Sequence, residues 1–190
     1  YAAYSSLCVE RQERQPLDLE LPERVICLGK NGDVTSVKFK DRLDAHRLIE
    51  EFMIMVNVAA AECSAAKKEP CLFRIHEEPD KEKIEALRDT AQSVGLNLAK
   101  GAALRTRHLN QLLRQAEEQK EAELLSVTTL RAMTQAYYSR DNFGHFGLAL
   151  QAYAHFTSPI RRYADLVVHR ALIRAHKWGE GGLTHEEEEL

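Results

Sequence analysis

Three side chains that can do chemistry recur at helical spacing near the C-terminal end of the chain. Arg161, Asp165 and His169 are four residues apart, so they share one face of any helix that carries them. A guanidinium is a planar fork that can bind two phosphate oxygens at once. With Arg162 next to it, this pattern indicates a phosphate-binding site. The pattern alone also fits an ordinary helix on which Arg161 and Asp165 form a surface ion pair.

The helix that carries these residues is predicted to begin at Ser158 and Pro159. Serine is a strong N-cap residue, and proline suits the first helical position because its missing N–H is no loss there. The unpaired N–H groups at such an end attract an anion. A strand over residues 146–150 is expected before the helix, because apolar residues alternate there. The buried face is predicted from a stripe at helical spacing, formed by Ile160, Ala164, Val167 and Ala171.

The composition is typical of a globular domain, and any nucleic-acid contact must come from a local basic patch. The 190 residues are 44% hydrophobic and 29% charged, and the net charge of −3 argues against a generally basic nucleic-acid-binding surface. No apolar run approaches the roughly 18 residues of a membrane span, and no signal peptide opens the chain, so a cytoplasmic protein is expected. The four cysteines form no CxxC pair and are predicted to be buried free thiols.

The other elements follow from apolar spacing and turn residues, and they predict a mostly helical α+β fold in one domain. The expected elements are a helix over 1–14, a hairpin over 25–37 around Asn31-Gly32, a helix over 44–66, a short strand within 70–79, a helix capped by Asp80, and helices around 109–116 and 124–137.

Two acids interrupt the helix expected over 44–66. Glu50 lies almost opposite the apolar stripe, whereas Glu51 lies at its edge, where a carboxylate could point into a groove. Both could equally be solvated surface acids. The apolar stripe comprises Leu48, Ile49, Phe52, Val56, Ala59 and Ala60.

A long run of the chain closely resembles the signature of the ribonuclease II and ribonuclease R exoribonucleases, H-F-G-L-x4-Y-x-x-F-T-S-P-I-R-R-Y-x-D-x3-H-R. The run begins at His145 and ends at Arg170. Residues 46–53 are similar to the H-x-L-I-E-E-F-M helix of that family, and residues 73–79 to its Y-R-V-H-E-x-P segment. The resemblance covers nearly all of residues 1–190, but only the second half of the family's RNB catalytic domain. It implies an α+β fold with a hairpin and short mixed strands, and no complete second domain.

The resemblance implies a magnesium-dependent hydrolase that removes nucleotides one at a time from the 3′ end of single-stranded RNA and releases nucleoside 5′-monophosphates. In that family Mg²⁺ is held by aspartates of the form D-x5-D-x-D-D in the first half of the domain. The eight aspartates of this chain are scattered, so no complete metal site is expected here and the chain alone is expected to be inactive. The parent enzyme would supply that first half and flanking cold-shock-like and S1-like domains.

The resemblance also implies roles for individual residues. Arg161 would stabilise the scissile phosphate, with Asp165 and His169 holding it in place, and Glu51, or else Glu50, would contact RNA near its 3′ end. Tyr163 is expected in the core beside them. Further RNA contacts are expected from His155, Thr157, Ser158 and Arg162. Leu19 stands where bacterial relatives often carry an aromatic that helps to clamp the RNA end.

Two other classes of function remain open on the sequence. A non-catalytic RNA-binding module would fit the missing aspartate cluster. A helical protein-interaction domain without RNA would fit the acidic balance of the chain. RNA binding that weakens with salt would separate the first from the second, because neutralised phosphates release counterions.

Overall fold

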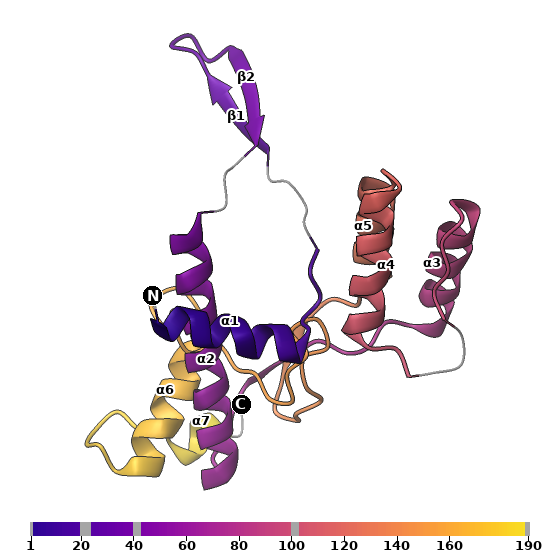
Figure 1. Ribbon diagram of the computed structural model, residues 1–190. Helices are drawn as coiled ribbons and strands as arrows, with labels where there is room; N and C mark the ends of the chain where they lie inside the picture. The colour runs from indigo at the N-terminus through magenta and orange to yellow at the C-terminus, as the bar shows by residue number, and fades with distance from the viewer. Residues whose placement is uncertain (1, 20–23, 40–42, 100–102, 189–190) are drawn as a thin grey trace.

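Helices dominate the structure, a computed structural model that describes residues 2–19, 24–39, 43–99 and 103–188. This confirms the mostly helical α+β fold with short antiparallel strands (Figure 1). The elements of the described residues are α1 Ala2–Arg14, β1 Arg24–Leu28, β2 Val34–Phe39, α2 Asp44–Lys67, β3 Phe73–Ile75, α3 Lys81–Ser93, α4 Thr106–Glu118, α5 Ala122–Ala132, β4 Tyr137–Ser139, α6 Tyr163–His176 and α7 His185–Glu188. None of the described helices is long and apolar enough to cross a membrane.

The predicted hairpin is confirmed and stands apart from the helices (Figure 1). β1 and β2 pair antiparallel, with Arg24 opposite Phe39. Gly32 has a φ of +85°, which glycine adopts without steric cost at a tight turn. The strands carry large apolar residues that are mostly exposed, such as Ile26 and Phe39.

Two apolar clusters hold the helices together. One joins α3, α4 and α5 through buried leucines such as Leu87, Leu109 and Leu125. The other joins α2, β3 and α6 through residues such as Ala61, Ile75 and Val168. In Figure 1 the first group lies on the right and the second forms the lower left of the molecule, with α1 crossing α2.

Polar side chains of α4 bind the segment that follows α1. Asn110 donates from its amide to the Pro16 carbonyl oxygen at 2.8 Å and accepts from the Asp18 N–H at 2.9 Å. The Thr106 hydroxyl donates to the Gln15 carbonyl oxygen at 2.6 Å. Leu19, in the same segment, packs against the α3–α5 cluster. This segment therefore ties α1 to the group of α3, α4 and α5.

β3 places the signature segment beside α2 and α6. It pairs antiparallel with β4 on one side, and on the other its Arg74 N–H donates to the Tyr153 carbonyl oxygen at 2.8 Å. The strand predicted over 146–150 is wrong: these residues form a turn closed by two backbone hydrogen bonds between His145 and Leu150. Ala149 has a φ of +53°, so the apolar alternation came from a tight turn and not from extended backbone.

α6 begins at Tyr163, not at Ser158–Pro159 as predicted. Residues 159–161 form a turn, and the Ser158 carbonyl oxygen accepts from the N–H groups of Arg161 and Arg162. Ile160 and Tyr163 were both expected in the core. Ile160 is fully exposed and Tyr163 is 70% exposed, so both expectations are wrong. Ala164 and Ala171 of the predicted stripe are buried, as expected, and Asp165, Val168 and Leu172 are buried with them.

Two further boundaries and faces differ from the prediction. The buried face of α2 includes polar residues such as Asn57 and Ser64, whereas Ile49 and Val56 of the predicted apolar stripe are exposed. Which face of α2 is buried depends on where its polar side chains find hydrogen-bond partners in the tertiary structure. The spacing of apolar residues does not show those partners. The helix expected over 124–137 ends at Ala132, because Met133 is extended and the chain continues into β4.

We predict that Leu87→Ala lowers the free energy of unfolding by about 2–5 kcal/mol, because Leu87 is completely buried and its truncation leaves a cavity. Leu130→Ala on α5 is the matched control: Leu130 is 48% exposed, and its change should stay within about 0.5 kcal/mol. Chemical denaturation followed by circular dichroism measures both, and equal losses would contradict the assignment of this cluster as core.

Candidate functional site

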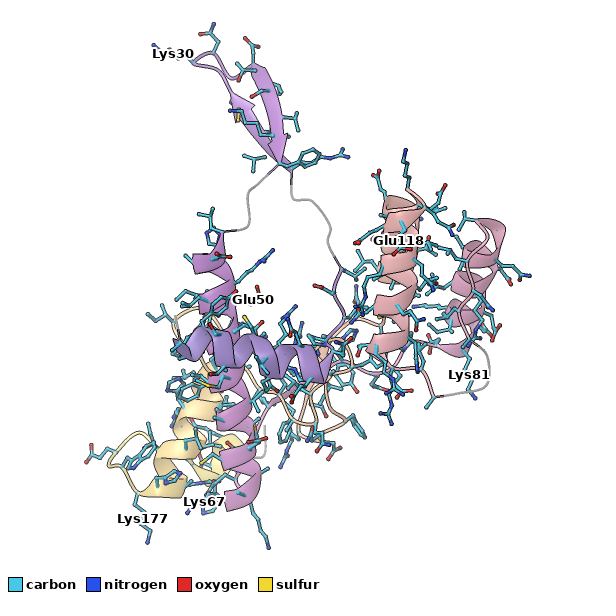
Figure 2. The ribbon with its side chains drawn as sticks, viewed as in Figure 1. Lys30, Glu50, Lys67, Lys81, Glu118 and Lys177 are labelled. Atoms are coloured by element: carbon cyan, nitrogen blue, oxygen red, sulfur yellow. The ribbon has the colours of Figure 1, made fainter. Side chains whose placement is uncertain are left out.

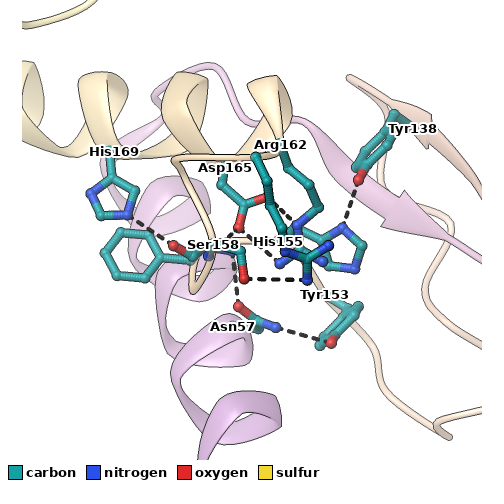
Figure 3. A network of polar contacts seen from close by, with 10 residues as sticks. Asn57, Tyr138, Tyr153, His155, Ser158, Arg162, Asp165 and His169 are labelled. Carbon is teal, nitrogen blue, oxygen red and sulfur yellow. Dashed lines mark hydrogen bonds and ion pairs between the residues drawn. The ribbon is translucent and has the colours of Figure 1, made fainter. Parts of the chain in front are cut away.

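The candidate site is the turn of residues 155–162, which lies between the middle of α2 and the start of α6 (Figure 3). Asn57 of α2, which is 2% exposed, holds one end of it. Its Oδ1 accepts from the Phe156 N–H at 2.9 Å, and its Nδ2 donates to the Tyr153 hydroxyl at 3.0 Å. A buried amide needs hydrogen-bond partners, and these two bonds fix both the Asn57 side chain and the turn.

Asp165 holds the other end of the turn from inside the protein. Its carboxylate has no exposed surface, and Oδ2 accepts from the Ser158 N–H at 2.7 Å. Arg162 approaches the same carboxylate with two nitrogens, Nε 2.8 Å from Oδ1 and Nη2 2.9 Å from Oδ2. A bidentate guanidinium compensates part of the large cost of burying a carboxylate.

His169 fixes the middle of the turn. Its Nε2 lies 2.8 Å from the Phe156 carbonyl oxygen, and since a carbonyl can only accept, this nitrogen carries the hydrogen. The imidazole also stacks on the Phe156 ring, with centroids 3.8 Å apart and planes 3° from parallel. The expectation that Asp165 and His169 hold Arg161 therefore needs correction: their contacts are to Arg162, Ser158 and Phe156, and they act on Arg161 through the turn.

The structure separates the two adjacent arginines. Arg162 is committed to Asp165, whereas Arg161 is exposed and its Nη2 lies 3.5 Å from the Ser158 hydroxyl, at the limit of a hydrogen bond. Thr157 adds a hydroxyl without a hydrogen-bond partner among the described residues. The turn thus presents the Arg161 guanidinium and the Ser158 hydroxyl, whereas the Thr157 hydroxyl is buried. Asn57, Asp165 and His169 hold its backbone.

His155 lies against aromatic rings beside the turn. Its Nδ1 is 2.6 Å from the Tyr138 hydroxyl, and the ring meets that of Tyr153 edge-on. Burial first, and then the charge of Arg162, lower the pKa of His155 to about 4. Burial first, and then the neighbouring His76, lower the pKa of His145 to about 4 as well. Both rings are therefore neutral at pH 7, and His155 can offer a polar atom but no charge.

Glu51 is also buried on α2, six residues before Asn57, which is a rise of about 9 Å. It is 6% exposed, and its Oε1 pairs with Arg11 Nη1 at 2.7 Å while Arg14 Nη2 is 3.9 Å from Oε2. With Glu50 it lines a cavity of about 480 Å³ between α1, α2 and α4. The groove that the sequence indicated for Glu51 is therefore present, but the carboxylate is already partnered by α1.

Sequence reasoning overlooked Asn57 and Tyr138 as members of the site. Asn57 carried a signal, since an amide on the inner face of a helix must find hydrogen-bond partners. Tyr138 carried none, because β3 pairing alone brings β4 next to His155.

The described residues do not fit the magnesium site of the resembled enzymes. They contain no group of three or more histidine, cysteine, aspartate or glutamate side chains that could hold a metal ion. Mg²⁺ takes several oxygen ligands in near-octahedral geometry, and the buried Asp165 carboxylate is already paired with Arg162 and accepts from the Ser158 N–H. Asp41 lies outside the described residues.

We predict that Asp165→Asn lowers the free energy of unfolding by about 3 kcal/mol, because the neutral amide keeps the shape but leaves the Arg162 charge without its counter-ion. Asp89→Asn on α3 is the control, since Asp89 is exposed. Urea titrations of both variants measure the loss, and a change no larger than that of Asp89→Asn would show that the ion pair does not stabilise the turn.

Acid should destabilise the protein through its neutral histidines. The folded-state pKa of His145 and His155 lies near 4, below the ordinary 6.5, so the unfolded chain binds more protons between these values. Stability is therefore complete above about pH 6.5 and falls as the pH drops toward 4. Denaturation at pH 7, 6 and 5 should show this slope, and His155→Asn should make it shallower. A slope that is the same in His155→Asn would contradict this role of His155.

Comparison with known proteins agrees with the signature. Residues 1–177 match the family described as RNB domain. The chain is 42% identical over 185 residues to ribonuclease R of Escherichia coli K12, which is 96% of this chain and 23% of that protein.

Solved structures of Mycoplasma genitalium RNase R match 98% of this chain. The complex with ribose-methylated single-stranded RNA has a TM-score of 0.84 at 26% identity and is covered over 29% of its length. The complex with double-stranded RNA has a TM-score of 0.83 at 27% identity and is covered over 33%. This chain thus spans about a quarter to a third of such proteins. The resemblance read from the signature is confirmed, and the chain belongs to the RNB domain family.

Proposed function

We propose that this chain supplies the phosphate-stabilising half of the catalytic centre of a 3′-to-5′ exoribonuclease of the ribonuclease II/R type. That enzyme hydrolyses single-stranded RNA from its 3′ end and releases nucleoside 5′-monophosphates. Arg161 binds the scissile phosphate, and the residues around it hold the turn from which Arg161 projects. The relatives support this assignment, because Mycoplasma genitalium RNase R has been solved with RNA bound.

The main support for this proposal is that two neighbouring arginines have different surroundings. Asp165 neutralises Arg162 inside the protein, while Arg161 stays exposed on the same braced turn. A positive group that is held in place before the reaction stabilises charge as it develops on a phosphate, without further reorganisation. His155, Thr157 and Ser158 add polar contacts, and Arg162 contributes chiefly by fixing the turn.

The cavity beside Glu51 extends the proposed RNA site along α2. Carboxylates accept hydrogen bonds and repel phosphates, so Glu51 and Glu50 suit the hydroxyl groups of ribose better than the backbone. Arg11 offsets part of that repulsion through its ion pair with Glu51. The last nucleotides of an RNA strand would then lie between this cavity and Arg161.

In the proposed enzyme, the residues that bind Mg²⁺ lie outside this chain. Mg²⁺, when bound by the parent enzyme, supplies a metal-activated water and neutralises phosphate charge. We propose that the first half of the catalytic domain holds it, and that cold-shock-like and S1-like domains complete RNA binding. The 190-residue chain alone is then inactive.

We predict that Arg161→Ala weakens binding of a fluorescent single-stranded RNA to this chain by about tenfold, since a charge-assisted phosphate contact is lost. The slope of log K against log salt should fall by about 0.7. Arg131→Ala on α5 is the control, because Arg131 is also exposed but lies in the other group of helices. Anisotropy titrations at several salt concentrations measure both quantities. An absence of RNA binding would favour a protein-interaction domain instead.

A second assay tests whether this chain binds RNA without hydrolysing it. This chain should not shorten 3′-labelled or 5′-labelled RNA in the presence of Mg²⁺, because the described residues contain no cluster of carboxylates that could hold a metal ion. RNA binding that depends on Arg161, together with no shortening, is the expected pair of results. Stepwise shortening that is lost in Arg161→Ala would contradict the proposed inactivity and place metal ligands within this chain.

A further inference from the structure

A thiol and an imidazole meet at the far end of the α2–α6 pair, away from the candidate turn. The sulfur of Cys63 on α2 lies 3.2 Å from Nε2 of His176, in the last turn of α6. The two residues are 113 positions apart in the chain, so only the packing of α2 on α6 brings them together. At this distance a neutral imidazole can accept the thiol hydrogen.

The chain fixes the His176 ring in this position. Lys177 has a left-handed backbone, with φ 55° and ψ 42°, which ends α6 and turns the chain back. The Trp178 N–H then donates to the Ile173 carbonyl oxygen at 3.1 Å. Its indole stacks on the His176 ring, with centroids 4.5 Å apart and planes 15° from parallel. The imidazole is therefore packed on one face, with Nε2 toward the sulfur.

Two lysines lie at the same end of the helix pair as this contact (Figure 2). Lys67 follows Cys63 by four residues and so lies on the same side of α2. Lys177 extends from the same end of the helix pair (Figure 2). The thiolate, and not the thiol, is the form of cysteine that attacks an electrophile.

The other three cysteines have different surroundings. Cys71 is buried, and burial raises the pKa of its thiol to about 11. Cys8 hydrogen-bonds Tyr4. Cys27 lies in the projecting hairpin. Cys63 is partly exposed, as are Cys8 and Cys27, so the expectation that all four thiols are buried is wrong.

We propose that Cys63 is a reactive thiol, activated by His176 and oxidised by hydroperoxides. The thiol proton passes to His176 Nε2 as the sulfur attacks one oxygen of the peroxide. The O–O bond breaks and an S–O bond forms, and the departing hydroxide takes a proton to become water. The sulfur is oxidised by two electrons to a sulfenic acid, and the peroxide is reduced by the same two electrons. This reaction does not depend on RNA or on a metal.

The test exposes the chain at pH 7 to limiting hydrogen peroxide, with dimedone present to trap sulfenic acid. Peptide mass spectrometry then gives a separate labelling rate for each of the four cysteines. We expect Cys63 to react at least about tenfold faster than Cys27, since a positioned general base accelerates proton transfer. Cys71 should be the slowest. A Cys63 rate no greater than that of Cys27 would overturn the proposal.

His176→Gln tests the role of the imidazole, because glutamine can hydrogen-bond to sulfur but is not a base. The Cys63 rate should fall to within about twofold of the Cys27 rate, while His185→Gln leaves all four rates unchanged. An unchanged Cys63 rate in His176→Gln would overturn the activation by His176. Cys71 monitors folding in the same experiment. If its labelling rate rises in His176→Gln, that variant is partly unfolded, and the proposal is then judged by the relative rates of Cys63 and Cys27 in the unaltered chain.

Discussion

A fully buried carboxylate organises the candidate site. Asp165 cannot keep its charge in the interior without strong partners, and it finds them in the Arg162 guanidinium and the Ser158 N–H. Both partners belong to the turn before α6, so satisfying one charge also shapes the loop. Arg161 is left outside this arrangement, and its positive charge is available at the surface of a turn that cannot easily move.

The long helix α2 is the other half of this arrangement. Its buried face is unusual in carrying polar residues, and they bind segments that are distant in the chain: Glu51 pairs with α1, and Asn57 holds Phe156 and Tyr153. Cys63 extends this series to the end of α6. Each contact compensates the desolvation of a polar group, which makes the position of α2 against its neighbours specific as well as stable.

A phosphate site built in this way differs from one formed by mobile surface lysines. Asn57, Asp165 and His169 hold the turn through its backbone atoms, so its path does not depend on the Arg161 side chain. Preorganisation of this kind is what a developing phosphate charge requires. The neutral His155 beside it adds hydrogen-bonding capacity without competing with Arg161 for the anion.

The sequence by itself determined the family, the helical character, the Asn31-Gly32 hairpin and the long helix over 44–66, because local propensity, turn residues and a long signature are all local information. It did not determine where α6 begins or which face of α2 is buried. It also could not tell which of two adjacent arginines is neutralised. Only the tertiary structure decided these points, because they depend on which buried polar groups find partners across the α2–α6 interface. Asp165 accepts from the Ser158 N–H, and no spacing rule along the chain reveals that contact.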